Sequence, residues 1–153
     1  MDNNDILRRI RYTFDYNDEK MIAIFGLADR EVTREQVSSW LKKEDVDGFQ
    51  PCSDELMAAF LNGLINDKRG KKEGEQPKPE SQLNHNIIFR KLKIALNLQA
   101  DEIIELLASV DFRMSKHELS AFFRKPDHRH YRDCKDQILR NFLQAVQSKY
   151  RPE

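Results

Sequence analysis

The sequence predicts an all-α protein built from two tandem, gapless four-helix repeats packed about a pseudo-twofold axis. Apolar residues recur at helical spacing along most of the chain. Five Gly and five Pro in 153 residues leave little turn material for a many-stranded sheet. Residues 4–70 also align without a gap with residues 86–152, at a constant shift of 82 positions from Asn4 to Asn86.

The repeat is visible in long matching strings. VTREQVSSWLKK matches MSKHELSAFFRK, and CSDELMAAFLNGL matches CKDQILRNFLQAV. The helical pattern of apolar residues survives the shift, which chance similarity rarely produces. Because a unit of this size buries only about 60% of its unfolded surface, we expect the two units to pack against each other.

Four helices are expected in each repeat. The first is predicted to be capped by Asn4 and by Asn86, since an Asn side chain can accept an orphan backbone N–H. The third is expected to begin at a capping box, Thr33 with Gln36, which recurs as Ser115 with Glu118. The apolar faces of the four helices are Ile6, Leu7, Ile10 and Phe14; Met21, Ile22, Phe25 and Ala28; Val37, Trp40 and Leu41; and Leu56, Met57, Phe60, Leu61 and Leu64. Their counterparts follow 82 residues later.

The chain divides into three segments. Residues 1–70 form the first helical repeat, 71–83 a charged, Pro-containing linker, and 84–153 the second helical repeat. Together the repeats are expected to make one all-α body.

The matching strings resemble the YehS-like bacterial family, a group of small proteins with a domain of unknown function. The resemblance runs from NNDILRRIRYTF through EVTREQVSSWLKKED and CSDELMAAFLNGLI to NHNIIFRKLKIALNL and LSAFFRKPDHRHYRDCKDQILRNFL. It implies a bacterial cytoplasmic protein with two related helical units, and it brings no catalytic residues.

Composition limits the classes of function. Lys and Arg number 26, as do Asp and Glu, so the formal charge is zero and gives phosphate binding no overall help. No segment is apolar for the roughly 18 residues that a membrane helix needs. The first residues lack the apolar core of a signal peptide. With two cysteines in the chain, the sequence predicts a cytoplasmic protein without membrane contact.

The segment FRKPDHRHYRDC, residues 123–134, resembles a metal or catalytic motif. The first repeat tests that interpretation, because it keeps the cysteine as Cys52 but replaces His128 and His130 by Val46 and Gly48. We therefore expect no metal and no cofactor, and thiols of Cys52 and Cys134 that close the loop. A disulfide or redox role for the two cysteines is the alternative.

The sequence contains no Gly-rich phosphate loop, GxSxG elbow or HExxH helix. It therefore predicts a protein that is not an enzyme and has no catalytic residues.

Basic residues on the first and third helices are the candidate contacts for a ligand or nucleic acid. They are Arg8, Arg9, Arg11, Lys42 and Lys43 in the first repeat, and Arg90, Lys91, Lys93, Arg124 and Lys125 in the second. VTREQVSSWLKK also resembles the recognition helix of a helix-turn-helix, although the turn before it lacks the usual Gly. Any capped amphipathic helix with a basic end shows the same pattern.

A protein surface is the rival interpretation. Trp40, Phe122 and Phe123 lie beside basic residues and would form a groove or a dimer interface if the third helix were partly uncovered; otherwise they are core. The sequence favours a protein-interaction or regulatory binding module, whose partner is another protein or a second copy of the chain. Nucleic-acid binding through the repeated basic helices is the alternative.

Overall fold

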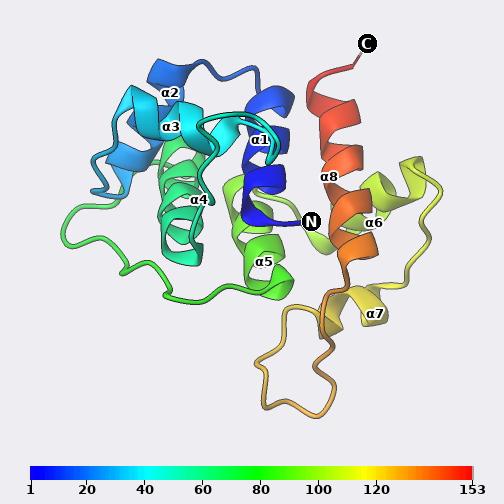
Figure 1. The fold of residues 1–153 in the computed structure, drawn as a ribbon. Helices are drawn as coiled ribbons and strands as arrows, with labels where there is room; N and C mark the ends of the chain where they lie inside the picture. Colours follow the sequence, from blue (N-terminus) through cyan, green and yellow to red (C-terminus); the bar gives the residue numbers. More distant parts are fainter. Residues whose placement is uncertain (153) are drawn as a thin grey trace.

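The computed structural model describes residues 1–152, and these form eight α-helices and no β-strand, which confirms the all-α prediction (Figure 1). The first repeat contains α1 (Asn3–Thr13), α2 (Asp18–Leu27), α3 (Arg34–Leu41) and α4 (Asp54–Arg69). The second contains α5 (His85–Ala95), α6 (Ala100–Ser109), α7 (Lys116–Ala121) and α8 (Asp136–Tyr150). All four helices of the second repeat begin 82 residues after their counterparts.

The helix starts follow local capping chemistry, with one correction. Both capping boxes are confirmed: the hydroxyls of Thr33 and Ser115 accept the N–H of the residue three positions on. The expectation that Asn4 and Asn86 cap the first helices is wrong. Asp2 and Asn84 are the N-caps, and Asn4 and Asn86 lie buried inside α1 and α5.

Two contacts between the halves confirm the pseudo-twofold relation. The Met1 amino group donates to Asp136 Oδ1 at 2.8 Å, and the Leu83 amide donates to Asp54 Oδ2 at 2.9 Å. Residues 1 and 83, and residues 54 and 136, are equivalent in the repeat. A rotation that exchanges the two halves therefore carries one contact onto the other.

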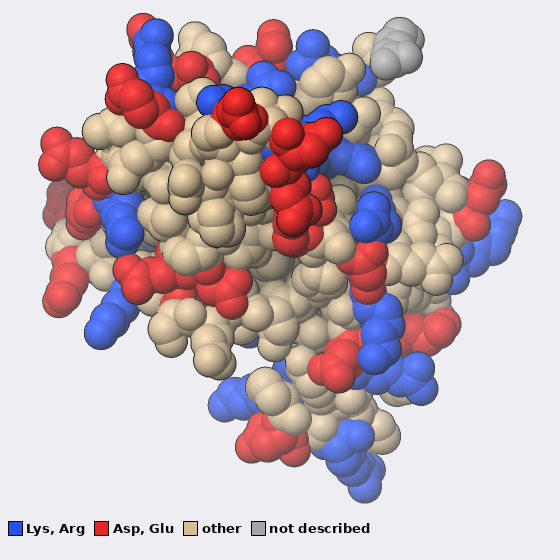
Figure 2. All heavy atoms as spheres, viewed as in Figure 1, with Lys and Arg blue, Asp and Glu red and all other residues tan. Residues whose placement is uncertain are grey.

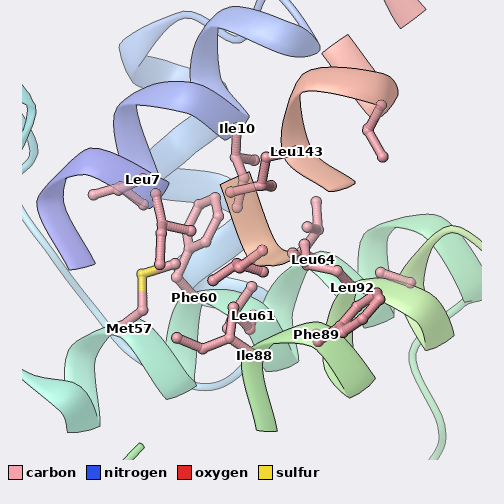
Figure 3. Close-up of a cluster of buried hydrophobic side chains, with 14 of the residues drawn as sticks. Leu7, Ile10, Met57, Phe60, Leu61, Leu64, Ile88, Phe89, Leu92 and Leu143 are labelled. Carbon is pink, nitrogen blue, oxygen red and sulfur yellow. The ribbon is translucent and has the colours of Figure 1, made fainter. Parts of the chain in front are cut away.

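The halves share one hydrophobic core. Figure 3 shows Leu7 and Ile10 of α1 with Phe60 of α4, Phe89 of α5 and Leu143 of α8 around a common centre. Burial of apolar surface from both halves is the main stabilising term, at about 25 cal/mol per Å². The repeats therefore stabilise each other.

Two seams join the halves on either side of this core. We call the contact between α4 and α5 the α4–α5 seam, and the contact between α1 and α8 the α1–α8 seam (Figure 1). The rotation that exchanges the halves also exchanges the seams. The α4–α5 seam is the more extensive of the two.

The linker between α4 and α5 is held to both halves. The Lys71 ammonium lies 3.1 Å from Asp29, and the Glu80 carboxylate lies 3.0 Å from the ammonium of Lys91. The linker thus covers one edge of the α4–α5 seam. No helix of the described residues is long and apolar enough to cross a membrane.

Candidate binding site

The cysteine-bearing loops are held by buried asparagines. The Asn86 amide group donates to the carbonyls of Phe122 at 3.1 Å and Arg132 at 2.7 Å, and its carbonyl accepts the Cys134 N–H at 2.8 Å. Asn4 makes the equivalent three bonds in the first repeat. The duplicated motif is therefore a structural clamp between the first helix and the loop.

Both cysteines are unsuited to nucleophilic chemistry. Cys52 and Cys134 are free and buried, and burial raises the pKa of each thiol to about 12. At neutral pH both thiols stay protonated, whereas the thiolate is the nucleophile and metal ligand. Their place beside a helix start does not offset this burial.

The histidines lie on an exposed loop that projects from the body of the molecule between α7 and α8 (Figure 1). His130 lies 5.6 Å from His128 and 6.3 Å from His117 of α7, measured between ring centroids. The proximity of His117 is not apparent in the sequence. Within residues 1–152, no three His, Cys, Asp or Glu side chains are arranged to hold a metal ion.

Trp40 and Phe122 belong to the core, and Phe123 is partly buried against it. Trp40 and Phe122 are each only 5% exposed, and Phe123 packs edge-on against the buried Phe89 ring at 4.9 Å. This overturns the interpretation of these aromatics as an exposed groove. The helix that resembles a recognition helix, α3, is therefore anchored in the core by Trp40.

The ten candidate basic residues do not form one face. Figure 2 shows acidic and basic side chains interleaved over the visible surface. Lys91 is buried, Lys42 donates to the Asp47 carbonyl, and Lys93 lies over the Phe123 ring. Four further candidates do not line the hollow that the next paragraph describes: Arg11, Arg90, Arg124 and Lys125.

Three of the ten, Arg8, Arg9 and Lys43, meet in a hollow on the α1–α8 seam. The hollow is open to solvent and has a volume of about 610 Å³. It is lined by Met1, Asp5, Arg8, Arg9, Tyr12, Lys43, Arg140 and Gln147. Four basic side chains thus surround one carboxylate, that of Asp5.

The cations of the hollow differ in how far they are neutralised. Arg8 pairs with Asp5 and donates to the Lys42 carbonyl, and Arg140 pairs with Asp136. In residues 1–152, neither Arg9 nor Lys43 forms an ion pair with a carboxylate.

Of the two cations without an ion pair, Arg9 has a hydrogen-bond partner across the seam. It donates to the Gln144 side-chain oxygen at 3.1 Å. Partial burial, and secondly the charge of Arg140, lower the pKa of Arg9. A partly buried cation near a like charge and without a counter-ion favours binding of an anion.

Arg140, Tyr12 and Gln147 were not among the sequence candidates. The sequence feature that could have identified Arg140 is a difference between the repeats, because its counterpart in α4 is Ala58. Ala58 is fully buried in the first repeat, whereas Arg140 is exposed in the second.

The chain matches the model of a protein family, "Protein of unknown function (DUF1456)", twice, over residues 3–70 and 85–151. Each match spans one repeat. The chain is also 45% identical over 144 residues to "Uncharacterized protein YehS" of Escherichia coli (strain K12), across 94% of this chain and 92% of that protein. No solved structure matches it. The chain, with its two copies of one helical unit, therefore belongs to the DUF1456 family.

Proposed function

We propose that this protein acts without catalysis, as an interaction module that binds a protein partner at the hollow of the α1–α8 seam. One observation supports this most directly: Arg9 and Lys43 line a hollow that is open to solvent, and neither forms an ion pair with a carboxylate among residues 1–152. Uncompensated cations beside a polar rim are typical of surfaces that steer and orient a charged partner.

A catalytic role has less support. The residues that suggested chemistry in the sequence lie in separate places: the thiols are buried and protonated, and the histidines project on an outer loop. A nucleic-acid surface is also less favoured, because only three of the ten candidate basic residues line the hollow, and acidic and basic side chains are interleaved over the surface visible in Figure 2.

Site-specific photo-crosslinking in living bacterial cells tests the proposal. A photoreactive phenylalanine analogue replaces Tyr12, which lines the hollow. The matched control replaces Ile94, the equivalent residue of the second repeat, whose side chain is 44% exposed.

We expect a discrete adduct from position 12 that is degraded by protease, resists nuclease and disappears in Arg9→Glu. Position 94 should give none. Equal adducts from both positions, a nuclease-sensitive adduct, or none at all would each contradict the proposal.

A further inference from the structure

We propose that the α1–α8 hollow binds an extended acidic segment of the partner protein, with a Glu or Asp carboxylate placed on Arg9. This inference rests on the proposed function and names the chemistry of the partner. The structure supplies the argument, because the molecule already contains such a complex within its own chain, at the other seam.

That internal complex is the α4–α5 seam with its linker. Lys91 Nζ donates to Asn62 Oδ1 at 2.5 Å and lies 3.0 Å from Glu80 Oε1. The Lys91 side chain is 11% exposed. A basic residue of the first helix is thus satisfied by an amide across the seam and by a carboxylate from an extended segment.

The α1–α8 seam repeats two of these three partners. Arg9 is the counterpart of Lys91, and Gln144 is the counterpart of Asn62. The bond from Arg9 to Gln144, 3.1 Å long, reproduces the bond from Lys91 to Asn62. Glu80 has no counterpart among residues 1–152, and the solvent-open hollow lies beside Arg9, the counterpart of the lysine that Glu80 pairs with.

The charges around Arg9 favour an acidic occupant. Lys43, which forms no ion pair within residues 1–152, adds a second cation, and Arg140, which pairs with Asp136, lines the hollow where the α4–α5 seam has Ala58. Arginine also binds a carboxylate through two parallel N–H donors, which lysine cannot do. Arg140 is therefore the basic side chain of the hollow that has no basic counterpart at the seam that binds Glu80.

The shape of the hollow suits an extended chain. Its α1 wall runs from Asp5 to Tyr12, and the seven steps between these residues span roughly 10 Å at 1.5 Å per residue. An extended peptide covers that length with about three residues. Tyr12 and Gln147 line the same hollow and offer hydrogen-bonding groups to its backbone.

Nuclear magnetic resonance titration with two synthetic peptides tests the inference. The probe has the sequence of residues 77–83 with Lys78→Glu, and keeps Glu80. The control peptide has Lys78→Gln and Glu80→Gln. We expect the probe to shift backbone signals of Arg9 and Gln144 with a dissociation constant of about 1 mM or below, and the control to bind at least fivefold more weakly.

Three protein variants localise the effect. Arg9→Glu and Lys43→Glu should each weaken the probe at least fivefold, and the exposed Lys43 keeps the test valid if Arg9→Glu fails to fold. Arg113→Glu makes the same charge change on an exposed loop and should leave binding unchanged.

The inference is overturned if 5 mM probe leaves Arg9 and Gln144 unshifted, or if the control peptide binds equally well. It is also overturned if sodium acetate or phosphate reproduces the shifts at the same concentration, which would make the hollow a site for free anions. Self-association of the protein through the α1–α8 seam, detected by light scattering, would also contradict the inference. A crosslinked partner at position 12 without probe binding leaves the proposed function standing and removes this inference alone.

Discussion

Gly63 of α4 faces the backbone carbonyl of Ile24 in α2 at a distance that no other residue allows. A Cβ added to Gly63 would lie 1.9 Å from the Ile24 oxygen, which is shorter than any real contact. This close crossing fixes α2 against α4. In the second repeat, Ala145 occupies the place of Gly63, and α6 packs less extensively on α8.

Gly63→Ala should therefore destabilise the protein by about 1–3 kcal/mol, because backbone must move to accept the methyl group. Gly26→Ala is the matched control: a Cβ at Gly26 meets nothing within 4 Å, and alanine there should stabilise α2 by up to ~1 kcal/mol. Urea unfolding followed by circular dichroism measures both. Equal effects of the two substitutions would show that the close crossing is absent.

Asn86→Ala should cost about 2–4 kcal/mol of unfolding free energy, because it leaves the buried Phe122 carbonyl, the partly buried Arg132 carbonyl and the Cys134 N–H without this partner. Asn4→Ala should cost a similar amount. Asn141→Ala is the control, since that side chain bonds only within its own helix and a change below about 0.5 kcal/mol is expected. Comparable losses at Asn86 and Asn141 would argue against the clamp.

Both native thiols should react slowly with a thiol reagent at pH 7.5. Burial excludes the reagent, and the raised pKa keeps Cys52 and Cys134 protonated. A cysteine introduced at the exposed Ser148 provides the fast reference. We expect the native thiols to label at least a hundredfold more slowly than this reference, and at the same rate once urea unfolds the protein. Fast labelling of folded Cys134 would contradict its burial.

Stability should fall at alkaline pH partly through the same two thiols. Their ordinary pKa of 9.0 applies when the chain is unfolded, and burial raises it to about 12 in the fold. Between these values the unfolded state binds fewer protons than the folded state, so unfolding becomes easier as pH rises. Each thiol contributes at most about 1.4 kcal/mol per pH unit.

Unfolding titrations from pH 7 to pH 11 compare the natural protein with the double variant Cys52→Ala, Cys134→Ala. Above pH 9 the variant should lose stability less steeply, and below pH 8 the two should change in parallel. Parallel curves over the whole range would show that the thiols are not buried in the fold.

Glu80→Gln should destabilise the protein by about 1 kcal/mol, because it removes the carboxylate beside the buried Lys91 ammonium while part of the pair remains solvated. Glu75→Gln, on an exposed part of the linker, is the control and should change stability by less than about 0.5 kcal/mol. Differential scanning calorimetry measures both. An equal, small effect of the two would show that the linker does not seal the α4–α5 seam.

The helical architecture could be predicted from the sequence alone, because apolar spacing, helix caps and the repeat are local or periodic patterns. Apolar spacing and capping boxes such as Thr33 with Gln36 act within a few residues, and the 82-residue shift provides each helix with a second example. Asn4 was wrongly predicted as a helix cap, because a cap and a buried clamp use the same side-chain oxygen. The partners of Asn4 in the fold lie 36 to 48 residues away in the sequence.

The sequence predicted only part of the lining of the α1–α8 hollow. Arg8, Arg9 and Lys43 were found because the repeat preserves basic residues at those positions. Arg140 was missed because its importance lies in a departure from the repeat, the loss of small Ala58. A comparison of the two halves for their differences would have identified it.

The equivalent contacts of Met1 with Asp136 and of Leu83 with Asp54 have one more consequence. The second half of one chain can make the same contacts with the first half of another chain as with its own first half. Only the effective concentration set by the linker favours pairing within one chain. A linker cut too short to span the seam would force that pairing between molecules. The product would be a closed, domain-swapped dimer that contains two complete copies of the core.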